Sequence, residues 1–426
     1  MKRIKYDNIF IFISFLFILC CCLFYGIRLI YFYRIENPKI VKKYILYDNI
    51  IQDKNLKNED KNYYFSGKNP NNFLEYSGRL FRIVSVSEDG YAKIITEDNQ
   101  TSLVWGYNQN YEDSYIRSWL NNSDNEYKSF IDSLHNKEGF MVNNKSYIDT
   151  IDNDNITNKK EISDKAGLIS VYEYNLAGAE DSYLNNGNSF WTSNNDENQN
   201  TYYVYKTGAL IKEKNQIIGV RPTITINAKI SNFKGNGTKN NPYKITFDKG
   251  DLLKDKYVGE YIKLDDDIYK IIETDNDYVK VVSELTTAKK FGSSSYFSND
   301  YGVGMYLNNS IYQSLPYKEK ILLGIFNTGK YDETNYYDFN IPAAYNEKAY
   351  ISLLSLGELF IEDYENYFLL SRPLVSKNEV YQVKKDGLIT LSNINNISNI
   401  RYCFHLDSEQ IVTSGNGSKK EPYIVR

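Results

Sequence analysis

The sequence predicts an α+β protein made of two tandem homologous domains, rich in short antiparallel strands with a few short helices, behind one N-terminal transmembrane helix. Two observations carry this prediction. An eleven-residue run that begins at Gly235 returns at Gly415 with both of its glycines, its Pro-Tyr pair and a closing β-branched residue. Near the N-terminus, residues 9–27 contain no charged side chain.

Each copy of the repeated run predicts the end of one strand, a tight turn and the start of another strand. Glycine adopts positive φ at little cost, so the Gly-x-Gly pattern is typical of such a turn. Proline lacks a backbone N–H, so it opens a strand more readily than it lies inside one. We therefore expect the run to close a domain in both places.

The resemblance between the two halves extends well beyond this run. The hairpin sequence of residues 81–95 resembles that of residues 269–282, and we align residues 168–171 with residues 350–353. The offset falls from 188 at Phe81 to 180 at Gly235 and never reverses. Loops of different length in two copies of one domain produce such a drift.

These patterns divide the chain into five segments. The segments are a basic N-terminal tail (1–8), a transmembrane anchor (9–33), a stalk or linker with a short amphipathic helix near residues 41–57 (34–62), repeat domain one (63–248) and repeat domain two, a degenerate copy (249–426). Each repeat has the usual size of a single domain.

The apolar stretch of residues 9–27 predicts a signal-anchor. At about 1.5 Å per residue it nearly matches the hydrocarbon thickness of a bilayer, and no small-residue cleavage site comes after it. Basic residues lie on both sides of it, namely Lys2, Arg3 and Lys5 before it and Arg28, Arg34, Lys39, Lys42 and Lys43 after it. A simple charge count favours a cytoplasmic C-terminal side. Because a signal-anchor with a basic N-terminus commonly exports the domains C-terminal to it, we expect a single-pass cell-membrane protein with extracellular C-terminal domains.

Composition excludes several classes of partner and chemistry. The formal net charge is −4, and the sequence has no stripe of basic residues. We therefore expect no nucleic-acid partner. Three of the four cysteines lie in the apolar stretch, and Cys403 is alone in the rest of the chain, so no disulfide forms beyond residue 22. The 41 tyrosines and the many Asn residues fit a sugar-binding surface, but the codon bias of an AT-rich genome accounts for them equally.

Domain one is predicted to contain short elements in a definite order. The pattern predicts a hairpin (80–86 with 91–95), short helices (113–119 and 127–134), a polar loop (143–165), strands (168–171, 190–192 and 202–205) and a last long strand (219–226). Pro222 places the start of that strand at an edge or a bend. Domain two repeats this order.

This order resembles the C-type-lectin-like fold, especially its bacterial formylglycine-generating-enzyme-like branch. The residues that carry the resemblance are Phe81–Val84, Trp119–Asn121, Phe190–Ser193 and Gly219–Pro222. The order also resembles an uncharacterised repeat domain of surface proteins from low-GC Gram-positive bacteria. The resemblance implies ligand contacts in loops on a rigid scaffold. The generating enzymes hold copper with two cysteines, and since this chain has only Cys403 outside the apolar stretch, we expect no cofactor.

Catalytic patterns are weak. His135 and His405 are the only histidines, one in each domain, and no Cys or His cluster has the spacing of metal ligands. No Gly-x-Ser-x-Gly nucleophile elbow is present. The acidic residues near Asp152 and Asp265 fit either cation clusters or solvated loops. We therefore expect no enzyme, although plentiful carboxylates leave a hydrolase with a carboxylate pair in domain one as the alternative.

Candidate binding residues lie where aromatic side chains lead into polar loops. They are Trp105, Tyr107, Trp191, Asn194, Asn195 and Arg221. Indole faces beside amide groups suit a sugar ring, but burial in the core is the alternative for both tryptophans. For Arg221 the alternative is a buried ion pair with a carboxylate such as Glu173.

Taken together, these patterns predict a membrane-anchored bacterial surface protein with non-catalytic binding or scaffold domains. Its expected partners are the membrane, through residues 9–33, and a glycan or protein ligand. A purely structural spacer is a further alternative. Domain one has all three tryptophans, Trp105, Trp119 and Trp191, so we expect it to keep any binding function and domain two to be mainly structural.

Overall fold

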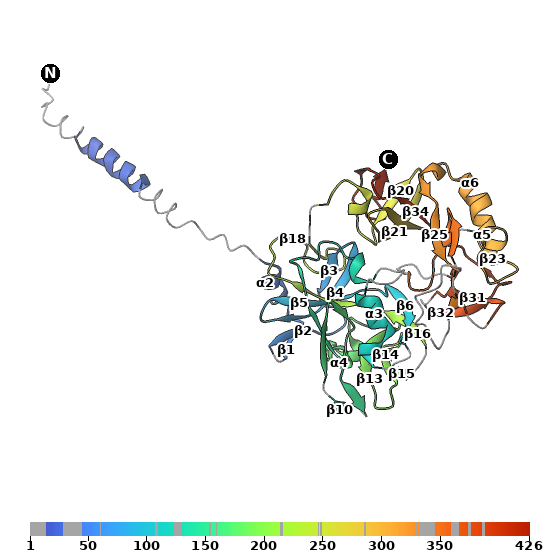
Figure 1. Ribbon diagram of the computed structural model, residues 1–426. Helices are drawn as coiled ribbons and strands as arrows, with labels where there is room; N and C mark the ends of the chain where they lie inside the picture. Colours follow the sequence, from blue (N-terminus) through green and yellow to red (C-terminus); the bar gives the residue numbers. More distant parts are fainter. Residues whose placement is uncertain are drawn as a thin grey trace, which may run out of the picture. The chain divides into compact units, whose positions relative to one another are not determined.

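The computed structural model describes residues 14–28 and 45–426, apart from short internal stretches. Those stretches are residues 60, 107–109, 123–128, 153–154, 159, 214–215, 246, 248, 285–286, 329, 332–345, 359–365, 374–375 and 386–387. Residues 1–45 and 46–426 form two compact units. Figure 1 shows the elements of each unit.

In the N-terminal unit, residues 14–28 form one helix. No helix in the described part of the chain is long and apolar enough to cross a membrane. The predicted transmembrane anchor at residues 9–33 is therefore wrong, as is the predicted single-pass membrane location with extracellular C-terminal domains. Residues 9–13 and 29–33 of that segment lie outside the described residues.

The larger unit begins with a ten-stranded sheet in the order β12-β17-β5-β4-β3-β19-β18, with β2 and β1 added beside β4 and β7 beside β17. Its elements are α2 (Leu46–Ile50), β1 (Leu56–Glu59), β2 (Asn62–Phe65), β3 (Phe73–Tyr76), β4 (Arg79–Ser87), β5 (Tyr91–Thr96), β7 (Met141–Val142), β12 (Ala166–Gly167), β17 (Thr223–Asn227), β18 (Phe233–Lys234) and β19 (Tyr243–Ile245). β4 and β5 are the predicted hairpin, which is confirmed.

The first half also contains a seven-stranded sheet in the order β10-β9-β13-β14-β15, with β16 beside β13 and β6 beside β16, and a ribbon of β8 and β11. These strands are β6 (Thr101–Val104), β8 (Asn144–Tyr147), β9 (Thr150–Asp152), β10 (Asn155–Asn158), β11 (Glu161–Asp164), β13 (Phe190–Asn195), β14 (Thr201–Val204), β15 (Leu210–Glu213) and β16 (Ile217–Val220). The helices are short, namely η1 (Tyr111–Asp113), α3 (Tyr115–Asn121), η2 (Ile131–Ser133), α4 (Val171–Ala177) and η3 (Ala179–Asp181).

The second half has an eight-stranded sheet in the order β24-β34-β22-β21-β20-β36-β35, with β28 on β34. Its strands are β20 (Tyr261–Leu264), β21 (Asp267–Thr274), β22 (Tyr278–Ser283), β24 (Ile321–Leu322), β28 (Ser352–Leu353), β34 (Tyr402–Asp407), β35 (Val412–Ser414) and β36 (Tyr423–Val425).

Smaller elements complete the second half. The strands are β23 (Lys289–Lys290), β25 (Gly324–Asn327), β26 (Lys330–Tyr331), β27 (Asn346–Ala349), β29 (Tyr367–Phe368), β30 (Arg372–Pro373), β31 (Glu379–Val383), β32 (Ile389–Asn393) and β33 (Ile397–Ser398). The helices are η4 (Leu253–Asp255), α5 (Gly302–Tyr306), the π-helix η5 (Leu307–Ile311), α6 (Tyr312–Ser314) and η6 (Lys318–Lys320).

The main sheets of the two halves have the same strand order. Phe81 of β4 lies between Leu74 of β3 and Thr96 of β5. In the second half, β21 lies between β20 and β22 in the same way, with Tyr269 at the place of Phe81. In each sheet the next strand after β3 or β20 runs parallel to it, namely β19 and β36. The fold is mixed α+β, rich in strands with a few short helices, as predicted.

The repeated Gly-x-Gly run forms the same closing turn in both halves. Gly237 and Gly417 have φ of 78° and 80°, in the left-handed region. The Gly237 carbonyl accepts from the backbone N–H of Phe73 at 2.9 Å, and the Gly417 carbonyl accepts from that of Tyr261 at 2.8 Å. The turn thus ties the last strand of each half to β3 or β20, and the predicted strand after the proline is confirmed as β19 and β36.

Other predicted boundaries need correction. Residues 46–62, predicted as linker, form α2, β1 and the start of β2, because Leu46 and Ile50 are fully buried and anchor this segment. The predicted loop of residues 143–165 contains β8 to β11. β8 and β11 form a two-stranded ribbon whose exposed side chains are polar, so the segment lacks the apolar alternation that marks a strand.

Three further elements differ from prediction. The long strand of residues 219–226 is two strands, β16 and β17, which belong to different sheets and separate at Arg221 and Pro222. Residues 168–171 lead into α4 instead of forming a strand, because the Ser170 side chain caps that helix. Of the helix predicted near residues 127–134, the described residues form only η2.

The closing turn gives a first prediction. A methyl group at Gly237 would lie 2.2 Å from the Asn71 carbonyl oxygen, whereas Gly187, with φ of 88°, has no atom within 4 Å of that position. We expect Gly187→Ala to cost about 1 kcal/mol of unfolding free energy from backbone strain alone. Gly237→Ala adds overpacking and should cost roughly 3 kcal/mol. Urea denaturation measures both, and equal losses would contradict the proposed closing role.

Candidate functional site

The two predicted ligand-stacking tryptophans lie in the core. Trp105 and Trp191 are fully buried and pack edge to face with ring centroids 5.5 Å apart. The Trp191 indole N–H donates to the Leu103 carbonyl at 2.9 Å. Neither ring has a face open to a ligand, so their prediction as an exposed binding surface is wrong and the alternative of core packing holds.

The predicted polar partners have structural roles as well. The Asn194 amide is buried, accepts from the backbone N–H of Val171 at 2.7 Å and donates to the Asp149 carbonyl at 2.8 Å. It therefore fixes the first turn of α4. Asn195 is half-buried at the end of β13, and Tyr107 lies outside the described residues. The structure does not bring the described members of the predicted set together on one surface.

Arg221 is a buried residue, as its alternative interpretation held, but its carboxylate partner differs. Its Nε donates to the Thr96 carbonyl at 2.8 Å and its Nη1 to the Leu184 carbonyl at 2.6 Å. The carboxylate nearest to it is Glu97, with Nη2 at 4.0 Å, and not Glu173. Arginine at the equivalent place of the second half, Arg401, also donates through Nε to the end of the central strand, at Ser283.

Glu173 belongs to a different buried cluster. It lies at the third position of α4, where its carboxylate accepts from the Ser170 backbone N–H and hydroxyl at 2.9 and 3.0 Å. The ammonium of Lys93, from β5, donates to the same carboxylate at 2.6 Å and to the Lys145 carbonyl at 2.8 Å. Both side chains are buried. The pair therefore joins the N-terminus of α4 to the centre of the main sheet.

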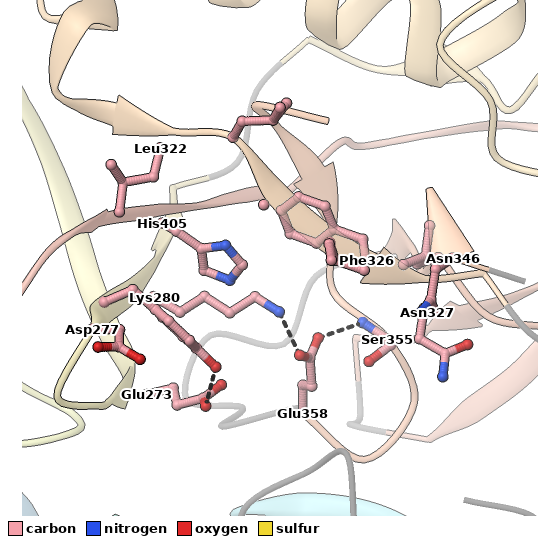
Figure 2. A pocket seen from close by; sticks show the side chains of 15 residues that line it. Glu273, Asp277, Lys280, Leu322, Phe326, Asn327, Asn346, Ser355, Glu358 and His405 are labelled. Carbon is pink, nitrogen blue, oxygen red and sulfur yellow. Dashed lines mark hydrogen bonds and ion pairs between the residues drawn. The ribbon is translucent and has the colours of Figure 1, made fainter. Parts of the chain in front are cut away.

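The second half contains the same pair. Lys280 of β22 is ion-paired with Glu358, and Glu358 accepts from the backbone N–H of Ser355 at 3.0 Å. Both members are largely buried. Figure 2 shows the Lys280 ammonium and the Ser355 N–H directed at the Glu358 carboxylate. A Ser-x-x-Glu sequence and a strand lysine thus build one motif twice.

A β-bulge accompanies each lysine. The register shifts between Ile83 and Ser85 in β4 and at the equivalent place, before Glu273, in β21. After each bulge one side chain stands directly across from the lysine, Ser85 from Lys93 and Glu273 from Lys280. Bulges re-aim side chains and are common beside functional sites.

A pocket lies over the pair in the first half. Its volume is about 620 Å³. Its lining combines tyrosines, amides, hydroxyls and charged side chains: Lys61, Asn62, Tyr64, Ser85, Ser87, Glu88, Asp89, Tyr91, Lys93, Val142, Asn143, Lys145, Tyr147, Glu173 and Thr225. We call this the first pocket. Its floor is the Lys93–Glu173 pair.

An equivalent pocket of about 440 Å³, the second pocket, lies over Lys280 and Glu358. Its lining is Glu273, Asp277, Tyr278, Lys280, Leu322, Leu323, Gly324, Ile325, Phe326, Asn327, Asn346, Ser355, Glu358, Leu370 and His405. Figure 2 shows the side chains of this pocket. The Tyr278 hydroxyl donates to Glu273 at 2.7 Å.

His405 fills part of the second pocket that smaller groups fill in the first. Its ring stacks on Phe326 with centroids 5.0 Å apart. A methyl group at Gly324 would lie 2.2 Å from His405 Nδ1. The residues at these two places in the first half are Thr225 and Asn144, whose side chains hydrogen-bond each other at 3.1 Å. The second half thus has a large side chain opposite glycine where the first half has two polar side chains of middle size.

The second pocket contains an ionised pair, Lys280 and Glu358, beside the neutral imidazole of His405. Burial raises the pKa of Glu358, but the Lys280 charge and the hydrogen bonds from Lys280 and Ser355 together outweigh burial, so the pKa of Glu358 is lowered. Burial lowers the pKa of Lys280, and Glu358 more than reverses this, so that pKa is raised. Burial, and then the Lys280 charge, lower the pKa of His405 to about 3. Burial raises the pKa of Cys403 to about 12, so this thiol stays protonated.

The Lys280–Glu358 pair decides what chemistry Glu358 can supply. Glu358 is held ionised by Lys280, and an acid that protonates a leaving group needs a raised pKa. Among the residues that the structure describes, no three His, Cys, Asp or Glu side chains are grouped so as to hold a metal ion.

This site was not predicted from the sequence because the two halves were aligned three residues out of register at the relevant place. β12 pairs with β17, and β28 pairs with β34. These pairings align Ser170 with Ser355 and Glu173 with Glu358, an offset of 185 residues, whereas the alignment by sequence has an offset of 182. The missed signal is the Ser-x-x-Glu capping box after two aliphatic residues in each half.

No family model, curated protein or solved structure matches this chain.

The buried pair gives a second prediction. Glu358→Gln leaves the Lys280 charge buried without its counter-charge, so we expect a loss of about 3–5 kcal/mol of unfolding free energy. The control is Glu284→Gln, which breaks the exposed pair of Glu284 with Lys419 and should cost less than about 0.5 kcal/mol. Chemical denaturation of both variants measures the difference. Similar small losses would show that the pair does not hold the fold together.

The half-buried His135 and the buried His405 give a third prediction, on pH. Burial and the charges of Arg79 and Lys137 lower the pKa of His135 to about 4. The pKa of His405 is lowered further, to about 3. An unfolded histidine, with pKa near 6.5, binds a proton that the folded one rejects, so stability falls as pH falls below about 6.5. The loss is roughly 1.4 kcal/mol per pH unit for each histidine while its folded form stays neutral.

We therefore expect His405→Gln to reduce the slope of stability against pH between about pH 6 and 4.5. Urea denaturation at several pH values measures this slope, and His135→Gln should reduce it in the same way. A slope unchanged by both substitutions would contradict the assignment.

Proposed function

We propose that this protein is a non-catalytic binding protein and that the first pocket binds a glycan. The observation that carries the proposal is the lining of that pocket. An aromatic ring on its wall, Tyr91, is 40% exposed, and the amides of Asn62 and Asn143 line the same pocket. A sugar ring offers C–H groups to an aromatic face and hydroxyls to amides, so this combination suits it.

The charge of the first pocket supports a neutral polar ligand. Its lining has three lysines (Lys61, Lys93, Lys145) and three carboxylates (Glu88, Asp89, Glu173), so its formal charge is zero. The ion pair on the floor satisfies its own charges. Hydroxyls and amides on the walls remain for hydrogen bonds that fix the orientation of a ligand.

The same geometry argues against the rival hydrolase. Such an enzyme needs two carboxylates that reach the scissile bond. Glu173 is buried and already accepts from Lys93 and from the backbone and hydroxyl of Ser170. Its carboxylate has little capacity left for a substrate.

We also propose that residues 63–248 and 249–426 are two copies of one domain, of the C-type-lectin-like kind that the sequence resembles. The equal strand order of the main sheets, the two closing turns and the two Lys–Glu pairs support this duplication. A pocket in each copy argues that the second copy is more than a spacer.

The proposal gives a fourth prediction. On an array of neutral and acidic oligosaccharides, the wild-type chain should bind a neutral member, and calorimetry should show Tyr91→Ala to weaken that binding at least tenfold, about 1.4 kcal/mol. Tyr91→Phe keeps the ring and should bind nearly as well. Tyr205→Ala, outside the pocket, is the control and should leave the affinity unchanged.

Failure to bind any oligosaccharide would overturn the glycan proposal. Release of reducing ends from a bound oligosaccharide by the wild-type chain would instead establish the hydrolase.

A further inference from the structure

The two pockets lie at equivalent places but differ on their rims. Leu322 of β24 and Val142 of β7 occupy equivalent places, because β24 pairs with β34 in the same way as β7 pairs with β17. The next residues along the chain are polar in the first half, Asn143 and Lys145, and apolar in the second, Leu323 and Ile325. The rim that suits a glycan in the first pocket is thus absent from the second.

The apolar rim of the second pocket is exposed. Leu322, Leu323 and Ile325 are 38%, 57% and 60% exposed. They are three of the nine large hydrophobic side chains that are exposed in the described part of residues 46–426. Clustered exposed apolar groups beside polar ones mark interaction sites, whereas single ones need no explanation.

The second pocket is also acidic. Glu273, Asp277 and Glu358 line it against one lysine, Lys280, which gives a net charge of −2 where the first pocket has zero. His405 adds no positive charge, because its imidazole is neutral. Glu358 is neutralised by Lys280, so the excess negative charge lies at Glu273 and Asp277.

We propose that the second pocket binds an extended polypeptide segment in which a lysine or arginine side chain is flanked by aliphatic side chains. The cation lies against Glu273 and Asp277, and the aliphatic groups cover Leu323 and Ile325. Charge complementarity selects the cation, and burial of the apolar rim supplies affinity.

The length of the rim favours a polypeptide over a small amine. Residues 322–325 extend over about 10 Å at roughly 3.3 Å per residue, more than a small amine covers. An extended peptide matches that length, and its alternate side chains point in the same direction. This proposal does not depend on glycan binding by the first pocket, because it concerns a different lining.

The test uses the full chain and fluorescein-labelled synthetic peptides. One peptide alternates leucine with lysine, a second alternates leucine with glutamate, and a third alternates serine with lysine. We expect fluorescence anisotropy to show binding of the leucine–lysine peptide, with at least tenfold weaker binding of the other two. Tenfold corresponds to about 1.4 kcal/mol.

The decisive variant is Leu323→Asn with Ile325→Lys, which gives the second pocket the rim residues of the first. It should weaken binding of the leucine–lysine peptide at least tenfold. Asp277→Asn, at an exposed turn residue, should weaken it less and make it less sensitive to salt. The matched control is Ile397→Asn with Ile411→Asn, two isoleucines outside the pocket that are 67% and 55% exposed.

A thermal melt of each variant first shows that it is folded. Unchanged peptide binding by the rim variant would overturn the proposal. An equal loss of affinity in the matched control would also overturn it, because the attraction would then be non-specific. Equal binding of the leucine–glutamate peptide would overturn the assigned charge. If the wild-type chain binds an oligosaccharide and the rim variant alone among the variants loses that binding, the second pocket is assigned to glycans instead.

Discussion

The buried pair of Lys93 and Glu173, with its counterpart of Lys280 and Glu358, is the constraint on which the rest of each half depends. Withdrawing two charges from water costs several kcal/mol, and their attraction offsets this only where further hydrogen bonds complete the site. Glu173 meets that condition, since it also caps α4 through Ser170. One carboxylate therefore fixes the start of a helix, the loop before it and the central strand of the main sheet.

A fixed floor leaves the walls free to change. Because the pair settles its own charges in both halves, substitutions above it alter what a pocket can bind without unbalancing the core. The first half has Asn144 and Thr225 where the second half has Gly324 and His405, so side-chain volume is distributed differently between the two neighbouring strands. The Lys–Glu pair is nevertheless present in both halves. A Lys–Glu pair that balances its own charges is thus compatible with two pockets of different character.

Sequence patterns predicted the features that depend on local backbone chemistry. The hairpin around Gly90 and the left-handed glycines of the closing turns follow from glycine and strand periodicity alone. Features that depend on distant partners were missed. The strands within residues 143–165 show no apolar alternation, and despite the uncharged run at residues 9–27 no helix in the described part of the chain is long and apolar enough to cross a membrane. For the site, the candidate residues Trp105, Trp191 and Arg221 are buried, because residue type alone does not tell an aromatic or cationic ligand contact from a core partner.

The neutral state of His405 has a consequence for the second pocket. A histidine at the surface would gain a proton below about pH 6.5 and cancel part of the charge of Glu273 and Asp277. Burial between Tyr278 and Phe326, beside the Lys280 ammonium, lowers the pKa of His405 to about 3, so its imidazole is neutral at physiological pH and in mildly acidic solution. The imidazole therefore acts as an aromatic spacer and adds no positive charge beside Glu273 and Asp277.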